Sequence, residues 1–445
     1  MPYRSDSMLI IGAGPCGLAH ASALKEAGIA YEQVEADADV GGNWYHGVYR
    51  TVHIISSRKT TEFTDYPMPA DYPEFPSGQQ ILDYMRAYAS HFDLYPNIEF
   101  NSKVTIVSPR ADELWDVELA TGERRTYKGV LVCNGHHWHK RFPNYEGEFA
   151  GEYLHSKDYK GPEQLTGKRV LIIGGGNSAC DVASEAARVS SSAHMSLRRG
   201  YWFMPKTLLG KPIVESPVMH LPVWLQRLIL RGLIRVVVGR YEDYGLPRPD
   251  HKIFEKHPTI STEVLHYLKH GRINPRPDVA RFEGNTVHFV DGTSTEFDTI
   301  ICATGFYVSF PFLPEGMVTV RDGNLAMLYA SCVLPEYRHL YIIGTRQTRY
   351  GIGPLLTPGS KLIARMIQLQ NQMELPIGLV MKESGAKLPS SHLVNPIKAL
   401  RQMRIANYTM PLLVGRERRL RKKLKPQRPA QPELKIPSKP DLQVY

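Results

Sequence analysis

The stretch MLIIGAGPCGLAHASALKEAG, residues 8–28, places an apolar strand, a glycine turn and a helical run in direct succession. Gly12-x-Gly14-x-x-Gly17 stands where the strand gives way to the helix. The first glycine of such a fingerprint allows a tight turn, the second lets the backbone approach a pyrophosphate, and the third lets the helix pack closely on the strand. The helix start then offers free N–H groups and a positive dipole end to phosphate. The stretch predicts a nucleotide-binding β-α-β unit.

The run AYEQVE that follows predicts a second strand, which ends at Glu35, 23 residues after Gly12. A carboxylate at this position accepts hydrogen bonds from the two hydroxyl groups of an adenosine ribose. A glycine fingerprint alone is weak evidence, but here strand, turn, helix, strand and acid are in register. The unit suits FAD, whose adenosine ribose has a free 2′,3′-diol.

The same arrangement recurs in KRVLIIGGGNSACDVASEAARVSSSAHMSLRRG, residues 168–200, with the fingerprint Gly174-x-Gly176-x-x-Ala179. Alanine is an accepted third residue of the fingerprint. At the place of the acid, 24 residues after Gly174, stand Arg198 and Arg199. Guanidinium groups bind a 2′-phosphate through charge-assisted, bidentate hydrogen bonds. This half therefore predicts NADPH binding, and we favour it over a degenerate copy that binds nothing.

Both halves close with an apolar strand that runs into small residues, GVLVCNG up to Gly135 and DTIICATG up to Gly305. We predict an α/β fold with two Rossmann-like dinucleotide-binding domains. The predicted division is an FAD-binding domain from residues 1–165 and 300–412, an NADPH-binding domain at 166–299 with a helical insertion at about 206–270, and a basic, Pro-rich tail at 413–445.

The composition is that of an ordinary globular protein, with 42% hydrophobic and 22% charged residues. Its net charge of +10 is concentrated near the end, because residues 415–445 hold ten Lys/Arg and three Asp/Glu. We interpret this tail as a solvated appendage and expect no nucleic-acid partner. The apolar run Met8 to Ile11 is too short for a signal peptide, so a cytoplasmic location is expected. The five scattered cysteines predict no metal site.

A third motif identifies the family. Phe149-x-Gly151-x-x-x-His155-x-x-x-Tyr159 lies just before the second glycine turn, and it resembles the FxGxxxHxxx(Y/F) motif of flavin-containing monooxygenases. Further matches are Gly41-Gly42-Asn43-Trp44, Cys133-Asn134-Gly135-His136-His137, Ser196 to Gly200 and Ala303-Thr304-Gly305. Together these motifs cover most of residues 8–306.

The resemblance implies an NADPH-dependent flavoprotein monooxygenase. In that family NADPH reduces FAD, oxygen adds to give a C4a-hydroperoxyflavin, and one oxygen atom passes to a soft nucleophile, nitrogen or sulfur, of a small organic substrate. The protein supplies orientation and a water-poor pocket, while the chemistry belongs to the cofactor. The expected cofactors are FAD and NADPH, and the expected partners are molecular oxygen and that substrate. A homodimer and a weak peripheral contact with a membrane are left open.

The family places an asparagine beside the flavin, but the corresponding region of this chain reads VYRTVHIISSRKTTEF. Ser56 and Ser57 are therefore candidate catalytic residues, since a serine hydroxyl donates a hydrogen bond. His155 is a third candidate, with two interpretations: a positioning residue at the domain junction, which we favour, or a direct acid/base. Gly151 is expected to form a turn that requires glycine.

The candidate cofactor-binding residues lie in both halves and in the family motifs. They are Gly12, Gly14, Pro15, Gly17, Glu35, Gly42, Asn43, Trp44, Gly174, Gly176, Asn177, Ser178, Arg198, Arg199, Ala303, Thr304 and Gly305. A helix beginning near Pro358 is expected to face the flavin with its positive dipole end.

Three other functions compete with this one. A Baeyer–Villiger ketone monooxygenase shares nearly all the motifs. A flavoprotein reductase or NADPH oxidase would transfer no oxygen, but a disulfide reductase needs a cysteine pair, and Cys16 has no near partner in the sequence. A non-catalytic NADP sensor would bind no FAD.

The most apolar segment, residues 220–240, carries Arg227, Arg231 and Arg235 at intervals of four, which places them on one face of a helix. We predict an amphipathic helix packed on the NADPH domain. The alternative is an interfacial helix whose arginines meet anionic lipid.

Overall fold

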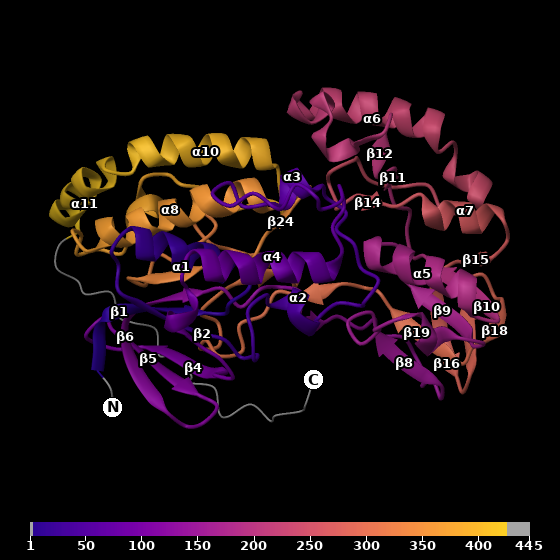
Figure 1. The fold of residues 1–445 in the computed structure, drawn as a ribbon, viewed down its shortest axis with the longest axis horizontal. Helices are drawn as coiled ribbons and strands as arrows, with labels where there is room; N and C mark the ends of the chain where they lie inside the picture. The colour runs from indigo at the N-terminus through magenta and orange to yellow at the C-terminus, as the bar shows by residue number, and fades with distance from the viewer. Residues whose placement is uncertain (1–2, 425–445) are drawn as a thin grey trace.

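The computed structural model describes residues 3–424 of the chain. Two sheets lie side by side along the long axis of the molecule, each with helices packed against it (Figure 1). Both sheets are built around parallel strands that alternate with helices. The predicted α/β class with two Rossmann-like units is confirmed.

The first sheet has the strand order β3-β2-β1-β6-β5-β4, and β23 also pairs with β6. The strands β1, β2, β3, β6 and β23 run parallel, while β4 and β5 form an antiparallel extension. Its strands are β1 (Tyr3–Ile11), β2 (Tyr31–Val34), β3 (Ile98–Glu99), β4 (Val104–Pro109), β5 (Trp115–Leu119), β6 (Arg124–Val132) and β23 (Leu340–Ile342).

The second sheet has the order β15-β10-β9-β19-β8, and every pair in it is parallel. Its strands are β8 (Glu152–His155), β9 (Arg169–Ile173), β10 (Ser192–Ser196), β15 (Ile273–Arg276) and β19 (Thr299–Cys302). The path β3-β2-β1-β6 of the first sheet thus recurs as β15-β10-β9-β19. The strand that precedes each glycine turn is central in both, so the two units are structural repeats.

The first glycine of each fingerprint is held in the same way. Gly12 has φ +102° and Gly174 has φ +128°, which residues with a side chain rarely adopt. A side-chain carbon would meet the carbonyl oxygen of Cys133 at Gly12 and that of Ala303 at Gly174. Glycine is therefore required at both places, because the turn passes directly over the end of the neighbouring strand.

Three helices cover one face of the first sheet and share one buried core with it: α1 (Pro15–Glu26), α4 (Gly78–His91) and α8 (Gly353–Gln370). Helix α8 begins five residues before the predicted start, and Pro358 lies inside it. The missing N–H of Pro358 removes one bond of the helix. Packing of α8 on α1 and on α10 (Pro396–Thr409) holds the helix in place despite that loss.

The first part of the predicted tail is a docked helix rather than a solvated appendage. Helix α11 (Leu412–Lys423) buries Leu413 and Glu417. The Glu417 carboxylate accepts hydrogen bonds from the backbone N–H groups of Glu374 (3.2 Å) and Leu375 (3.4 Å). Residues 425–445, which hold the Pro-rich part of the predicted tail, lie outside the described residues.

On the second sheet, α5 (Asn177–Val189) and α7 (Glu263–Lys269) pack on one face, and the small sheet β16 (Val279–Glu283), β17 (Thr286–Phe289) and β18 (Ser294–Glu296) covers the other. Strand β8 pairs with β19, so both belong to the second sheet. The predicted boundaries assign β8, and the part of β19 from residue 300 onward, to the FAD-binding domain instead. The motif Phe149 to Tyr159, which joins the two units, contributes β8 as an edge strand of the second sheet. Hydrophobic periodicity in the sequence does not predict this strand. The domain division itself stays a prediction.

The predicted insertion contains α6 (Val223–Val237), which Figure 1 shows above the second unit. Arg227 points inward, where its Nε donates to the carbonyl of Ile253 (2.8 Å). Apolar side chains are exposed instead, with Trp224 at 68% and Leu228 at 64%. The amphipathic helix is confirmed, but its exposed face is largely apolar. Within residues 3–424 no helix is both long and apolar enough for a membrane span.

The remaining elements are short. They are α2 (Asn43–His46), α3 (Arg58–Thr61), α9 (Ile377–Glu383), β7 (His139–Lys140), β11 (Phe203–Met204), β12 (Thr207–Leu208), β13 (Lys211–Pro212), β14 (Thr259–Ile260), β20 (Phe306–Tyr307), β21 (Val320–Arg321), β22 (Leu325–Ala326), β24 (Gln347–Thr348) and β25 (Leu393–Val394), with single 3₁₀ turns at 95–97, 162–165, 213–215, 217–220 and 241–244.

Buried histidines make the fold sensitive to acid. Burial lowers the pKa of His20 and of His194 to about 4 and that of His339 to about 3. Between these values and the ordinary pKa near 6.5, the unfolded chain binds protons that the folded chain does not. The free energy of unfolding should therefore fall as the pH falls from about 6.5 toward 4.

For His20 alone, we expect a contribution of about 1 kcal/mol per pH unit near pH 5.5. Urea denaturation of wild type and His20→Gln at pH 7.5, 6.5 and 5.5 measures it, and the variant should show the shallower pH dependence. Parallel pH profiles for the two proteins would contradict the assignment.

Candidate functional site

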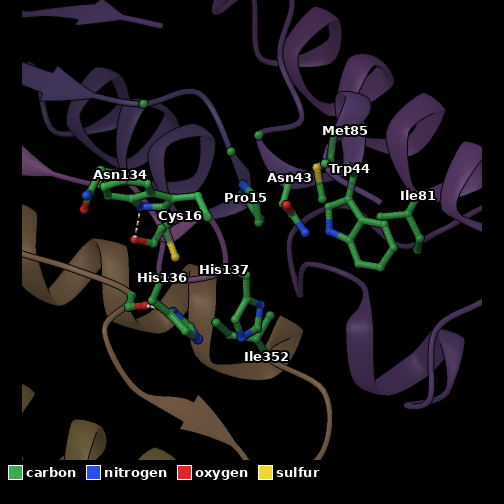
Figure 2. Close-up of a pocket in the computed structure, with 18 of the residues that line it drawn as sticks. Pro15, Cys16, Asn43, Trp44, Ile81, Met85, Asn134, His136, His137 and Ile352 are labelled. Carbon is green, nitrogen blue, oxygen red and sulfur yellow. Dashed lines mark hydrogen bonds between the residues drawn. The ribbon is translucent and has the colours of Figure 1, made fainter. Parts of the chain in front are cut away.

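A cavity of about 660 Å³ runs along the ends of the first sheet's strands. Its wall is formed by residues of the glycine turn after β1, of the segment 42–47 except Tyr45, of the segment 133–138 that follows β6, and of the segment 346–352 before α8 except Arg349. Figure 2 shows Pro15, Asn43 and His137 around its middle. Ligands of open α/β sheets bind at this edge, outside the carboxyl ends of the strands.

The glycine turn leaves room for a phosphate group. Gly12, Gly14 and Pro15 line the cavity, and Gly42 faces them from the start of α2. A side-chain carbon on Gly42 would lie 3.0 Å from the Cα of Gly14, so larger residues would fill this space. No side chain caps the start of α1, and its N–H groups are free for an anion. A side-chain carbon on Gly17 would lie 1.9 Å from the Gly12 carbonyl oxygen, so glycine lets α1 pack closely on the strand.

Glu35 closes one end of the cavity, directly after β2. It is 6% exposed, and its carboxylate accepts hydrogen bonds from the backbone N–H of Ala13 (2.5 Å) and of Asp37 (3.0 Å). Burial raises its pKa. A carboxylate fixed beside the glycine turn fits the ribose of an adenosine, so these residues fit FAD.

Asn43 and Trp44 lie on the short helix α2 and line the cavity. Lys157, which follows the FxGxxxH motif, donates from Nζ to Asn43 Oδ1 (3.0 Å). Burial lowers the pKa of Lys157. Lys157 also lines the cavity, and the sequence prediction missed it, because nothing in its spacing marks it.

The far end of the cavity is rich in basic side chains. The rings of His136 and His137 are 4.1 Å apart, and His136 Nδ1 bonds to the carbonyl of Gly344 (2.6 Å). Burial lowers the pKa of both histidines. His257 and Arg346 line the cavity too, whereas its two carboxylates, Glu35 and Asp37, both follow β2. This end is suited to an anionic ring such as reduced flavin.

The start of α8 borders the same end, as Gly351 and Ile352 line the cavity. The positive end of the helix dipole therefore lies at the cavity wall. This agrees with the predicted orientation of the helix, although the helix starts at Gly353.

The two candidate serines have different surroundings. Ser56 lines the cavity, and its Oγ is 2.8 Å from Thr61 Oγ1, which also lines it. Ser57 is 1% exposed and caps α3, where its Oγ accepts from the backbone N–H of Thr60 (3.3 Å). Ser57 is absent from the described cavity wall. Ser56 therefore remains as the candidate.

His155 is fully buried at the end of β8. Its Nε2 donates to the carbonyl of Gly305 (3.0 Å), while its Nδ1 accepts from the backbone N–H of Lys157 (3.1 Å). Burial lowers its pKa, which keeps the ring neutral. With both nitrogens engaged by backbone, His155 joins the motif to the end of β19. This favours the positioning role over direct acid/base chemistry.

The other motif residues hold the junction. Phe149 packs on Phe282 of the small sheet, with ring centroids 5.9 Å apart. Gly151 does not have a positive φ, so the predicted turn is wrong. A side-chain carbon there would lie 2.6 Å from the Asp298 carbonyl oxygen, and this close approach is what requires glycine. Tyr159 is fully buried, and its hydroxyl donates to Glu185 of α5.

Two carboxylates on one face of α5 tie the units together. Tyr49 donates to Asp181 Oδ2 (2.6 Å), and Thr51 donates to Glu185, which Tyr159 also contacts. Burial raises the pKa of Asp181, and the bond from Tyr49 opposes that rise. Asp181 and Glu185 follow the second glycine fingerprint, whereas Tyr49 and Thr51 follow α2. Their hydrogen bonds therefore connect the two nucleotide sites.

The second fingerprint forms the matching turn between β9 and α5. Asn177 and Ser178 start α5, and Asn177 Oδ1 accepts from the Ile260 N–H (2.8 Å). Arg198 is exposed after β10, while the Arg199 guanidinium lies 5.3 Å from the centre of the Tyr201 ring. The carboxyl ends of β9 and β10 are followed by Gly174, Gly176, Arg198 and Arg199. NADP binds at this edge of a parallel sheet.

The strand end Ala303-Thr304-Gly305 lies between the sites. Ala303 contacts Gly174, Thr304 Oγ1 donates to the carbonyl of Arg141, and Gly305 accepts from His155. These residues position the turn and the motif. Among the lining residues, His257 and Tyr350 were missed from the sequence, since they come from segments far from both fingerprints.

Fold and site define a flavoprotein oxidoreductase with two dinucleotide sites. The family described as flavin-binding monooxygenase-like matches residues 5–387. Flavin-containing monooxygenase 5 of Oryctolagus cuniculus is 33% identical over 81% of this chain and 72% of its own length. Dimethylaniline monooxygenase [N-oxide-forming] 2 of the same species is 31% identical over 75% of this chain and 67% of its own length.

Among solved structures, cyclohexanone monooxygenase from Rhodococcus sp. Phi1 bound to NADP+ has a TM-score of 0.66 at 17% identity, over 83% of this chain and 85% of its own. This likeness supports the fold. The chain belongs to the flavin-binding monooxygenase-like family. It is an oxidoreductase, a monooxygenase whose cofactors are FAD and NADPH and which uses oxygen and a small-molecule substrate. The expectation drawn from the motifs is confirmed.

The network on α5 can be tested with Tyr49→Phe. The change leaves the buried Asp181 carboxylate without its donor, so we expect the free energy of unfolding to fall by about 1–3 kcal/mol. Urea denaturation with Tyr45→Phe as the matched control measures it. A double-mutant cycle with Asp181→Asn should give a coupling energy above about 0.5 kcal/mol, and additive effects would show that the bond carries no stability.

Proposed function

We propose that this monooxygenase oxygenates nitrogen or sulfur in a small organic substrate. One oxygen atom of O2 passes to the substrate and the other leaves as water, with two electrons from NADPH and one proton. The N-oxide-forming relative supports nitrogen as an acceptor. When bound, FAD supplies the oxygen activation and the chain supplies position and surroundings.

The observation that carries this proposal is the continuity of the cavity. It runs from Glu35, beside the first glycine turn, to Ser56 and Tyr350 at the basic end. FAD would lie with its pyrophosphate at Gly12 and Gly14 and its ribose at Glu35. The basic end favours a negative charge on the reduced cofactor and leaves a water-poor wall for a substrate.

Ser56 would act in place of the family asparagine. The Thr61 hydroxyl donates to the Ser57 carbonyl (2.9 Å), so the Ser56 hydroxyl donates to Thr61 Oγ1 (2.8 Å) and would turn from it to donate into the cavity. His155 would act through Gly305 and Lys157, as a positioning residue rather than as an acid or base.

In the second unit, Gly174 and Gly176 would hold the NADPH pyrophosphate, and Arg198 with Arg199 the 2′-phosphate. Arg198→Ala should raise the KM for NADPH roughly ten- to a hundredfold, because a charge-assisted bond to phosphate is lost, and leave that for NADH unchanged. Steady-state reduction of the flavin with each nucleotide measures this, with Arg419→Ala on α11 as the control. Equal losses for NADPH and NADH would contradict the role.

The function is tested by oxygen stoichiometry. FAD-loaded enzyme with NADPH and either thioanisole or N,N-dimethylaniline should form the sulfoxide or N-oxide and little hydrogen peroxide. Ser56→Ala should raise peroxide per NADPH several-fold through loss of one hydrogen bond, while Ser90→Ala on the exposed side of α4 should not. Stoichiometric peroxide in the wild type with both substrates would favour the NADPH oxidase, and lactone from cyclohexanone the Baeyer–Villiger alternative.

A weak peripheral contact with a membrane is supported by the exposed Trp224, Leu228 and Val236 of α6, next to Arg231 and Arg235. The homodimer and the cytoplasmic location stay predictions.

A further inference from the structure

A lysine of the joining motif reaches into the FAD cavity from the second unit. Lys157 follows β8, the edge strand of the second sheet, and it lines the cavity together with the first glycine turn. Its Nζ donates to Asn43 Oδ1 (3.0 Å) on α2 and lies 3.5 Å from the backbone carbonyl oxygen of His137 after β6. Asn43 and His137 border the middle of the cavity (Figure 2), so the ammonium group lies there too.

The backbone of Lys157 is fixed by the second sheet. Its N–H donates to His155 Nδ1 (3.1 Å), and the fully buried His155 ring is bonded to the carbonyl of Gly305 after β19 (3.0 Å). The side chain of Lys157 extends from this support to the first unit. It is half-buried rather than enclosed, because the cavity reaches it. A ligand in the cavity therefore has access to the ammonium group.

The positive charge of Lys157 is not neutralised by the chain. Within residues 3–424 Lys157 forms no ion pair, because the adjacent acid, Asp158, pairs with Lys140 (2.6 Å) instead. Burial and the charges of Lys160 and Lys140 lower the pKa of Lys157, while Asp158 and Asp37 oppose this in part. A cation in a partly dry cavity attracts an anion more strongly than a cation in bulk water does.

The first glycine turn provides an anion site next to Lys157. Asn43, which Lys157 contacts, directly follows Gly42, and Gly42 packs closely on Gly14, where a side-chain carbon would lie 3.0 Å from the Gly14 Cα. The N–H groups at the start of α1 are free for phosphate. Backbone donors carry only partial charges, whereas a lysine supplies a full point charge to a phosphate group.

We propose that Lys157 binds a pyrophosphate oxygen of FAD, so that the flavin cofactor contacts both units of the enzyme. The inference rests on the proposed function for the position of the pyrophosphate at Gly12 and Gly14. NADPH also carries a pyrophosphate, but in the described structure the second glycine turn, Gly174 to Gly176, is not part of the wall of this cavity. The position of Lys157 on the wall beside the first turn therefore favours FAD as the source of the phosphate.

Flavin binding tests this without turnover. The full-length apoenzyme is titrated with FAD or with riboflavin, which has no phosphate, and binding is followed by flavin fluorescence. Lys157→Met should weaken FAD binding about tenfold or more, because a charge-assisted hydrogen bond is lost, and riboflavin binding less than about twofold. Lys157→Arg keeps the charge and should fall between wild type and Lys157→Met in its affinity for FAD.

Lys160 offers a matched control. Its Nζ donates to the His46 carbonyl (2.8 Å), so it also bridges the joining motif and α2, but it does not line the cavity in the described structure. Lys160→Met should leave the affinities for FAD and riboflavin within about twofold of wild type. A loss of FAD affinity in Lys160→Met equal to that in Lys157→Met would show that any cation at the junction acts alike, and would overturn the specific contact.

Thermal unfolding distinguishes phosphate binding from a structural role. Because Lys157 forms no ion pair in the described structure and lies near two other lysines, Lys157→Met should not lower the unfolding midpoint of the apoenzyme, whereas the rise in midpoint that FAD causes should shrink. A clear drop in the midpoint of the apoenzyme, or equal losses of affinity for FAD and riboflavin, would overturn the proposal.

Titration of the FAD-loaded enzyme with NADP+ separates the two sources of phosphate. Lys157→Met should bind NADP+ within about twofold of wild type, and a loss of NADP+ affinity without a loss for FAD would assign Lys157 to the other cofactor and overturn the proposal. If FAD binding depends on Lys157 as expected but the enzyme oxygenates no amine or sulfide, the proposed function fails and the phosphate contact stands.

Discussion

The hydrogen-bond network on α5 is the constraint on which the two-site geometry depends. Asp181 and Glu185 lie one helical turn apart, directly after the NADPH fingerprint. Tyr49 of the FAD side donates to Asp181, while Thr51 of the FAD side and Tyr159 of the joining motif donate to Glu185. Buried carboxylates cannot be left without donors at low cost. The two sheets are therefore held in one relative placement, and the cavity at their junction keeps its shape.

The electrostatics of the cavity follow from that placement. Its carboxylates stand at the end of β2, whereas histidines, Lys157 and Arg346 gather at the other end from segments that are distant in the chain. Burial lowers the pKa of His136 and of His137, so neither ring adds a fixed charge, and His136 Nδ1 bonds to the Gly344 carbonyl. The permanent positive charge comes from lysine and arginine, and it favours anions at the end where oxygen transfer would take place.

Several features could be predicted because they depend on local chemistry. The turns at Gly12 and Gly174 and the acid Glu35 have their roles set by a few neighbouring residues. Other predictions were wrong where distant contacts decide. Gly151 is required by the Asp298 carbonyl rather than by a turn, and Pro358 lies within a helix that packing sustains. Helix α11 docks through Glu417, although its composition resembles a solvated tail. Ser57 caps α3 through the nearby Thr60, and its catalytic role stays a prediction.

By itself, the sequence determined the fold class, the two nucleotide units and the family, since periodicity, glycine spacing and charge at strand ends are read from consecutive residues. Tertiary structure alone decided which side chains share the cavity. Lys157 meets Asn43, and Arg349 meets Phe254, across about a hundred residues of chain. Such contacts arise when separate segments pack on the same edge of a sheet, and their chemistry depends on burial and on the charges nearby, which no local pattern specifies.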